Sequence, residues 1–339
     1  MSKYFLCALS VSLFLLSCSN LKNIKVSQVE AIWFEYSPNQ NLNNGSTFQG
    51  EILLQTYDGK QHDVSKNNKI SFSSSDLRKS GNSYTIVKKS KAFNDDQCHL
   101  SLKYENKGEV YSSQDSMQMN FRGDLAILYN GAHGNNGKDQ RNRTTPLLLR
   151  DGKNGETGEN GGDGGASKSY TAHVWTIESM VYVHVKENNS NNFMKYKMTI
   201  GNDLLFNLSG GNGGDGGDGG DGGTGKNGSI SGDKIKRAGD AGNGGNAGNG
   251  GNGGNGGNLS LFIHENSSTI ENQLTIKTKG GHYGNRGEPG KRGVPGTPLS
   301  GQQAGRQGYP GSQGSAGYRG SDGSVQKYIQ NFDFSAYTE

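Results

Sequence analysis

The feature that most constrains this chain is the glycine found at every third position over much of its C-terminal two-thirds. The period runs unbroken from Gly210 to Gly228 and again from Gly239 to Gly257. An α-helix repeats about every 3.6 residues and a strand every two, so neither explains a period of three. A left-handed extended helix has three residues per turn, which puts every third side chain on one edge. Glycine on that edge predicts extended rods that pack closely and exchange backbone hydrogen bonds.

The periodic stretches form three pairs, each with an outgoing rod, a non-periodic loop and a returning rod. A strand-like run precedes each pair and another follows it. The preceding runs are residues 124–130, 203–209 and 273–279, and the following runs are residues 173–185, 259–264 and 325–334. The sequence therefore predicts three copies of strand, rod, loop, rod and strand, at about residues 123–192, 193–266 and 267–339.

In the second pair, two of every three residues are glycine, which clears two edges of each rod for neighbours. Ala241 and Ala247, with the smallest side chain after glycine, replace it without loss of the register. A disordered glycine-rich linker has no reason to keep that register, so the pattern favours an ordered bundle. Residues 287–296 would pass as a collagen fragment, but six rods in one chain can pack without a second chain.

This arrangement resembles the polyglycine-II bundles of the snow flea antifreeze protein and of the glycine-rich tip adhesins of some bacteriophage tail fibres. The resemblance covers about residues 131–323. It implies a six-rod polyglycine-II bundle and assigns no catalytic residue. This chain differs from both in the strands between its rod pairs and in the lipid anchor predicted below, so the resemblance transfers function only weakly.

The N-terminus reads as an export signal. Lys3 precedes an apolar run over residues 4–16 that is too short to span a bilayer. The run ends in Leu15-Leu16-Ser17-Cys18, which resembles the bacterial lipobox and implies that residues 1–17 are removed and that Cys18 receives lipid. Leu16 is a less usual lipobox residue, so a plain signal peptide cut near Ser17 remains the alternative. We expect an outer-membrane lipoprotein at the cell surface, with the periplasmic leaflet as the other location.

Residues 18–27 form a polar tether, and residues 28–122 show short alternating apolar runs separated by turn residues. Ile52 and Leu54 lie in one such run, for example, and Asp58-Gly59 follows it. The pattern predicts an Ig-like β-sandwich, and the chain as a whole is predicted to be all-β. Cys98 alternates with apolar residues as a buried strand position, and no intrachain disulfide is expected.

The composition and motifs do not indicate an enzyme. The formal net charge is +4, or about +3 without Lys3, which is too small to indicate nucleic acid binding. The run from Gly220 to Asn227 approaches a phosphate-binding loop, but Asn227 stands where the Mg²⁺ ligand Ser or Thr is required. No side chains have the spacing of a catalytic constellation or a metal site, so we expect no cofactor and no metal.

Asp215, Asp218 and Asp221 on one ridge suggest calcium. Consecutive triplets of an extended helix, however, advance about 9.3 Å. Calcium needs several oxygens at about 2.3 to 2.6 Å, which one ridge cannot supply. We therefore interpret these aspartates as a solvated ridge, together with Asn243, Asn246, Asn249, Asn252 and Asn255.

Two groups of residues are candidate binding sites. If the rod pairs point the same way, their loops converge at one basic tip, and loops on a rigid scaffold often carry recognition residues. The tip residues are Lys138, Arg141, Arg143, Leu148, Arg150, Lys226, Lys234, Lys236 and Arg237. A second face, on the third rod pair, consists of Tyr283, Arg286, Arg292, Arg306, Tyr309, Tyr318 and Arg319.

The sequence thus favours a membrane-anchored lipoprotein without enzymatic activity that acts as a surface binding or adhesion module through its tip. Its expected partner is a protein or an anionic glycan. The main alternative is a structural accessory subunit of an outer-membrane protein complex. An ice-binding protein is a minor alternative, because the charged residues of the third rod pair make a poor flat face for ice.

Overall fold

The computed structural model describes residues 24–143 and 150–338, and the chain is all-β with few helical residues, as the sequence predicts. No helix among these residues is long and apolar enough to cross a membrane. Two predicted site residues, Cys18 and Leu148, lie outside the described residues. The chain divides into unit 1, Met1–Ser90 with Asn94–Gly123, and unit 2, Lys91–Phe93 with Asp124–Glu339. Each unit is described by itself.

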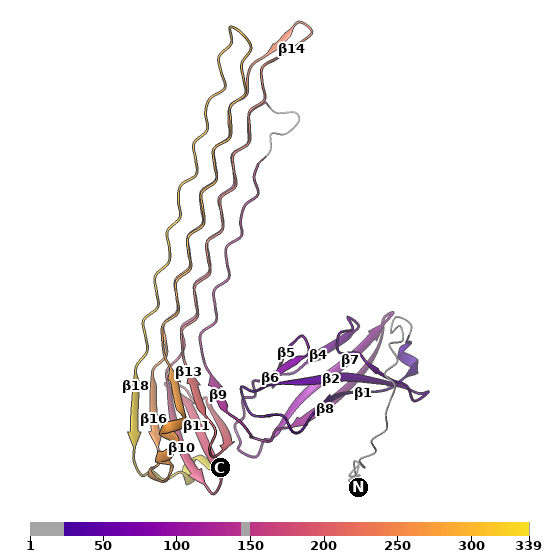
Figure 1. Cartoon of the computed structure of the whole chain (residues 1–339), viewed down its shortest axis with the longest axis vertical. Coiled ribbons are helices and arrows are strands. Elements are labelled where there is room, and N and C mark those ends of the chain that lie inside the picture. The colour runs from indigo at the N-terminus through magenta and orange to yellow at the C-terminus, as the bar shows by residue number, and fades with distance from the viewer. Residues whose placement is uncertain (1–23, 144–149, 339) are drawn as a thin grey trace. The chain divides into compact units, whose positions relative to one another are not determined.

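The described part of unit 1 consists of two antiparallel sheets that share one hydrophobic core (Figure 1). One sheet has the order β1-β2-β6-β5, with β3 beside β2, and the other has the order β4-β7-β8. The elements are η2 Val26–Gln28, β1 Val29–Tyr36, β2 Thr47–Thr56, β3 Gln61–Asp63, β4 Ile70–Ser73, β5 Leu77–Ser80, β6 Ser83–Ile86, β7 Gln97–Asn106 and β8 Glu109–Gln118.

Strand β7 shows why these residues form a sheet with one buried face. Cys98, Leu100, Leu102 and Tyr104 are buried, and the residues between them are polar and more exposed. This period of two is that of a strand with one face on a core. Burial raises the pKa of the Cys98 thiol to about 12, so the thiol packs as a small apolar side chain.

The described part of unit 2 contains a second core between two more sheets, together with a small hairpin. The larger sheet has the order β12-β11-β10-β16-β18, and the smaller, parallel sheet has the order β17-β13-β9. The elements are β9 Leu125–Leu128, β10 Tyr170–Ile177, β11 Met180–Glu187, β12 Phe193–Thr199, β13 Leu204–Asn207, β14 Ser229–Ser231, β15 Lys234–Lys236, β16 Leu259–Ile263, η3 Glu265–Gln273, β17 Leu274–Lys277, β18 Val325–Ile329 and α1 Ser335–Thr338.

Between these strands, the described residues include six extended segments, which we call rods (Figure 1). Rods 1 to 6 are residues 131–143, 152–167, 210–228, 238–257, 280–296 and 305–323. Their residues are in neither helix nor strand, and hydrogen bonds between their backbones recur at every third residue. Rods 1, 3 and 5 lie parallel in one row. Rods 2, 4 and 6 form a second row that runs antiparallel to the first.

The register of the strands continues into the rods. Leu125 of β9 pairs with Leu204 of β13, an offset of 79 residues. His133 and Asn212, on the rods that follow these strands, are bonded with the same offset of 79. In the other row, Asp151 and Asp240 are 89 residues apart, as are the paired first residues of β10 and β16. Each row of rods therefore extends a row of parallel strands.

The glycine content of a rod follows the number of its neighbours. Among the described rods, rods 3 and 4 each bond to four others, whereas rods 1 and 6 each bond to two. Rods 3 and 4 are also those with two glycines in most triplets. A methyl group on Gly217 would overlap the Lys138 carbonyl of rod 1, and one on Gly216 would overlap the Gly248 carbonyl of rod 4. A rod enclosed on several sides therefore has no room for side chains on those sides.

Alanines in rod 4 show the effect of one methyl group. At the level of Gly244, the N–H of Gly311 in rod 6 donates to the Gly290 carbonyl of rod 5. The corresponding bonds between rods 6 and 5 are missing, among the described residues, at the three levels where rod 4 has alanine, namely Ala238, Ala241 and Ala247. A methyl group at Gly244 would fall against that carbonyl and that nitrogen. Each alanine thus removes one hydrogen bond and leaves the bundle intact.

Candidate functional sites on the surfaces of unit 2

The third residue of each rod triplet links the rods of a row. Asn136 Oδ1 accepts a hydrogen bond from the Asp215 N–H at 3.0 Å, and Asp215 Oδ1 accepts one from the Asn285 N–H at 2.7 Å. In the second row, Asn243 Oδ1 accepts from the Tyr309 N–H at 2.9 Å. The predicted solvated ridge is therefore exposed, but its side chains also supply acceptors for backbone N–H groups of the next rod. This second role is not visible in the sequence, because it depends on which rods are neighbours.

The two rows present different chemistry to solvent. We call the third-position residues of rods 1, 3 and 5 the acidic face, since rod 3 contributes Asp215, Asp218 and Asp221 there. We call those of rods 2, 4 and 6 the amide face. Its central rod contributes Asn243, Asn246, Asn249, Asn252, Asn255 and Asn258, all of them exposed.

The predicted tip residues lie at two levels along the bundle. Lys138 and Arg141 are on rod 1 itself and not in a loop, because rod 1 continues to bond to rod 3 through Gln140 and Arg143. Arg143 is the last residue of rod 1, and the remaining described members lie nearer the end of the bundle that is far from the sheets. There the Lys226 N–H donates to the Arg150 carbonyl. Since rods 1, 3 and 5 are parallel, their far ends lie at the same end of the bundle (Figure 1).

Internal contacts hold most of the arginines at the tip. Arg143 forms an ion pair with Glu156. Arg237 contacts Asp151 at 3.1 Å and Asp240 at 3.3 Å. The Arg150 guanidinium donates to the carbonyls of Arg237 and Asn227. The tip is therefore less basic than its sequence suggests, because carboxylates that are distant in the sequence meet these arginines.

The most exposed part of the tip is the tip hairpin, β14 and β15 with their two-residue turn. Ile230 and Ile235 are directly paired across it, and each is 66% exposed. Lys234 and Lys236 are also exposed, on the opposite face of β15 from Ile235. Gly232 in the turn has a φ of 60°, a conformation that glycine adopts without strain. This hairpin is not among the predicted elements, although Gly-Asp between two short alternating runs is a recognisable hairpin signal.

The predicted face on the third rod pair is divided in the structure. Arg306, Tyr309 and Tyr318 are third-position residues of rod 6 and lie at the margin of the amide face. Tyr283, Arg286, Arg292 and Arg319 follow the third position in their triplets and lie on a different side of their rods. Arg292 donates to Gln307 at 3.1 Å, and Arg319 contacts Asp322 at 3.2 Å. Seven residues predicted as one face therefore contribute to two.

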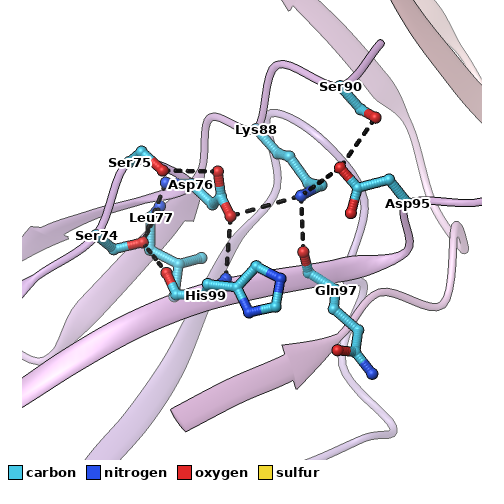
Figure 2. A network of polar contacts seen from close by, with 9 residues as sticks. All are labelled: Ser74, Ser75, Asp76, Leu77, Lys88, Ser90, Asp95, Gln97 and His99. Carbon is cyan, nitrogen blue, oxygen red and sulfur yellow. Dashed lines mark hydrogen bonds and ion pairs between the residues drawn. The ribbon is translucent and has the colours of Figure 1, made fainter. Parts of the chain in front are cut away.

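Unit 1 contains a buried polar network around Lys88, which is 6% exposed (Figure 2). Its Nζ lies 3.0 Å from Asp95 Oδ2 and 3.5 Å from Asp76 Oδ2, and it donates to the Gln97 carbonyl at 2.7 Å. Asp76 Oδ2 also accepts from the His99 N–H at 3.0 Å. A buried ammonium paired in this way fixes the loop between β6 and β7 to the start of β7.

Unit 2 has a half-buried and a buried histidine side by side in an aromatic layer. His173 of β10 and His184 of β11 are cross-strand neighbours, and Tyr337 of α1 stacks on His173 with ring centroids 4.5 Å apart. Burial, and then the charges of His173, Lys195 and Lys186, lower the pKa of His184 to about 4. The Nδ1 atoms of both histidines are buried without a hydrogen-bond partner among the described residues. These features keep both rings neutral near pH 7.

No known protein family, curated protein or solved structure matches this chain. Among the residues that the structure describes, no group of three His, Cys, Asp or Glu side chains is arranged to hold a metal ion. The candidate sites are the tip hairpin and the two faces of the bundle.

Proposed function

We propose that this chain is an outer-membrane lipoprotein without enzymatic activity, anchored through Cys18 at the cell surface, that binds a protein partner through its tip hairpin. The bundle holds the hairpin far from the sheets. Rod 3 alone, with 19 residues from Gly210 to Gly228, reaches about 55 Å if it rises about 3.1 Å per residue. A long, rigid support with a short exposed loop at its end suits a binding module.

The same proposal assigns finer fold names to the two units. We infer that unit 1 is an Ig-like sandwich and that the rods are polyglycine-II helices. Two facing antiparallel sheets with a shared core support the first assignment. Hydrogen-bond partners that advance by three residues along both rods, such as Gly211 to Gly165 and Gly214 to Gly162, support the second.

The exposed pair Ile230 and Ile235 is the single observation on which the binding function depends. Apolar side chains grouped on an exposed surface typically mark an interaction site. Each is 66% exposed, so neither belongs to a buried core. The arginines at the tip are engaged by carboxylates and carbonyls within the bundle, which favours a protein partner over an anionic glycan.

The test is binding of the purified chain without residues 1–17 to intact cells and isolated envelopes of the source bacterium. Replacing both isoleucines by serine is expected to weaken binding roughly tenfold or more, because burial of each side chain contributes about 1.5 to 3 kcal/mol. Val294→Ser is the matched control, since Val294 is 63% exposed on rod 5. Equal binding by the double variant and the wild type would reject the tip hairpin as the site.

The anchor has its own test. Cys18→Ala is expected to move the protein from the membrane fraction to the soluble fraction and to abolish labelling by a fatty acid analogue. Protease treatment of intact cells then separates the two locations, since a surface protein is degraded and a periplasmic one is not. If the Cys18→Ala variant stayed with the membrane, the lipid anchor would have to be abandoned.

A structural accessory subunit is the second candidate, and strand β18 favours it. β18 lies at the end of the strand order of the larger sheet, and all five of its residues are exposed. Val325, Tyr328 and Ile329 are each more than 40% exposed. An exposed apolar edge strand can pair with another chain. A partner that copurifies from detergent-solubilised membranes in fixed stoichiometry would favour this candidate over a transient binding module.

A further inference from the structure

The amide face is an ordered array of side chains, because each rung of the second row is tied by hydrogen bonds. At one rung, Asn160 Oδ1 accepts from the Asn249 N–H at 2.8 Å, and Asn249 Oδ1 accepts from the Ser315 N–H at 2.8 Å. The rungs of Asn243 and Asn252 repeat both bonds, with Asn154 and Asp163 as the acceptors on rod 2. At the rung of Asn246, the bond to the Ser312 N–H is present. Successive rungs are about 9.3 Å apart along the rods, and the side chains of a rung lie at the same level.

These bonds also determine what the asparagines offer to a ligand. An asparagine side chain has one carbonyl oxygen, which accepts, and one NH₂ group, which donates twice. Because Oδ1 of Asn243, Asn249 and Asn252 already accepts a bond from the neighbouring rod, the exposed NH₂ group, with two donors, is the main group that each side chain offers to a ligand. The amide face is thus an array of hydrogen-bond donors.

The bundle does not require amides for this role. On the acidic face, Asp218 Oδ1 accepts from the Glu288 N–H at 2.7 Å in the same way that Asn249 accepts from Ser315. A carboxylate and an amide are therefore equivalent as links between rods. The difference between the asparagines of rod 4 and Asp215, Asp218 and Asp221 of rod 3 therefore changes the exposed surface and not the links between rods.

Rod 6 adds hydroxyl groups and two aromatic rings to the margin of the amide face. Tyr309 and Tyr318 are 75% and 81% exposed and lie three triplets apart, about 28 Å along the rod. Between them, the third positions are Ser312 and Ser315. Small side chains between two large rings leave an open stretch on which an extended ligand can lie with a ring at each end.

We propose that the amide face binds an uncharged, extended polysaccharide. Its NH₂ and hydroxyl groups donate to sugar oxygens, while the rings of Tyr309 and Tyr318 pack against the apolar faces of sugar rings. A protein partner would need an apolar centre, which this face lacks between the two tyrosines. A nucleic acid would need cations, and the face has none over the same stretch of the described residues.

This inference goes beyond the proposed function, because it concerns a different surface and a different class of ligand. The ligand has no part in the tip hairpin, and the isoleucine variant should bind polysaccharide normally. The two proposals can therefore fail separately. A variant that loses cell binding but keeps polysaccharide binding would affect the site at the tip hairpin and not the amide face.

The test is retention of the purified chain, lacking residues 1–17, on insoluble cellulose and insoluble chitin. The decisive variant carries Asn243→Asp, Asn249→Asp and Asn252→Asp, which keep every Oδ1 acceptor but replace three donors by charged acceptors. The matched control carries Asp215→Asn, Asp218→Asn and Asp221→Asn on the acidic face. A second variant, Tyr309→Ser with Tyr318→Ser, removes the rings and leaves the backbone bonds in place. Thermal unfolding tests whether all three variants are folded.

We expect the asparagine variant to bind at least roughly tenfold more weakly, the tyrosine variant roughly fivefold more weakly, and the acidic-face control like the wild type. Failure of the wild type to bind either polysaccharide overturns the proposal, as does equal binding by the wild type and the asparagine variant. Thermal hysteresis that disappears in the asparagine variant, with no retention on polysaccharide, would assign the face to ice instead. If the asparagine variant does not fold, the tyrosine variant and the acidic-face control test the proposal, and equal binding by the tyrosine variant and the wild type overturns it.

Discussion

Unit 1 and the rods of unit 2 bury their backbones by opposite means. In unit 1, large side chains such as Leu54 and Tyr84 fill the space between two sheets and are fully buried. In rods 3 and 4, the buried positions are almost all glycine, with alanine at Ala238 and Ala247, and neighbouring backbones fill the space themselves. Unit 1 therefore depends on the hydrophobic effect, whereas the bundle depends on packing and hydrogen bonds between backbones.

The comparison also explains how the glycine bundle can be ordered at all. Glycine loses more conformational entropy on folding than any other residue, so a glycine rod is costly to order. One end of each rod meets a strand of the two sheets, and those sheets enclose a hydrophobic core that contains Leu125, Phe206 and Leu261. The offset fixed in the sheets continues along the rods. The core of unit 2 thus aligns the rods, and the bonds between rods repeat that alignment.

The largest expected effect is in unit 1, where a side chain can be removed from a conventional core. Leu54→Ala leaves a cavity at a fully buried position and should destabilise unit 1 by about 2 to 5 kcal/mol. Denaturant unfolding followed by Trp33 fluorescence, in a Trp175→Phe background, measures it. Val110→Ala, at a residue that is 52% exposed, is the control and should change stability by less than about 0.5 kcal/mol. Equal effects would mean that the unit 1 core is not its source of stability.

In the bundle, adding a side chain should destabilise the fold, as removing one does in unit 1. A methyl group at Gly251 of rod 4 would overlap the Gly162 carbonyl of rod 2, whereas one at Gly162 would lie 3.2 Å from the nearest atom, the Asn135 nitrogen. We expect Gly251→Ala to destabilise unit 2 by about 3 kcal/mol through overpacking and a lost hydrogen bond. Gly162→Ala should cost about 1 kcal/mol or less. Calorimetric unfolding of both variants tests this, and a reversed order would contradict the observed packing.

The links between rods should respond to the loss of an acceptor and not to the loss of an amide. Asn249→Ala removes the acceptor of the Ser315 N–H and should cost about 0.5 to 1.5 kcal/mol. Asn249→Asp keeps that acceptor and should stay within about 0.5 kcal/mol of the wild type. Thermal unfolding compares the two. If the aspartate variant were as unstable as the alanine variant, the side-chain links would not contribute as described.

The last prediction concerns pH, and it again separates the units. Because burial lowers the pKa of His184 to about 4, the unfolded chain binds more protons than the folded one below its ordinary pKa of 6.5. The stability of unit 2, and with it the Tm, should therefore fall as the pH falls from about 6.5 to 4. Melting followed by Trp175 fluorescence, in a Trp33→Phe background, measures this. His184→Gln should flatten the dependence, and an unchanged slope would exclude His184 as its source.

Much of the architecture could be read from local patterns. Alternation at Cys98 and Leu100 predicts a strand with a buried face, and the strand-like runs beside the glycine stretches correspond to strands such as β9, β13 and β16. A tract with two glycines per triplet predicts a rod that packs against several other rods. Such patterns are readable because each residue type reports whether its own position has space for a side chain.

The candidate sites were less predictable, because they depend on which distant residues meet. Arg237 was expected to be a free cation, but Asp151 from another rod pair lies against it. Tyr309 and Arg319 are predicted to lie on one face, but a rod with three residues per turn places them on different sides. The tip hairpin with Ile230 and Ile235 was missed because its six strand residues are a weak signal inside a long polar segment.

The sequence by itself determined that this chain is all-β, that glycine leaves room for rods to pack, and where most of the rods begin and end to within a few residues. Those properties belong to single residues and their spacing along the chain. Only the tertiary structure decided which rods are neighbours, that Asn249 and Asp218 serve as links between them, and that the asparagines of rod 4 and the aspartates of rod 3 belong to different rows. The physical reason is that these contacts join residues 66 to 89 positions apart, and their pairing is set by the register of the sheets.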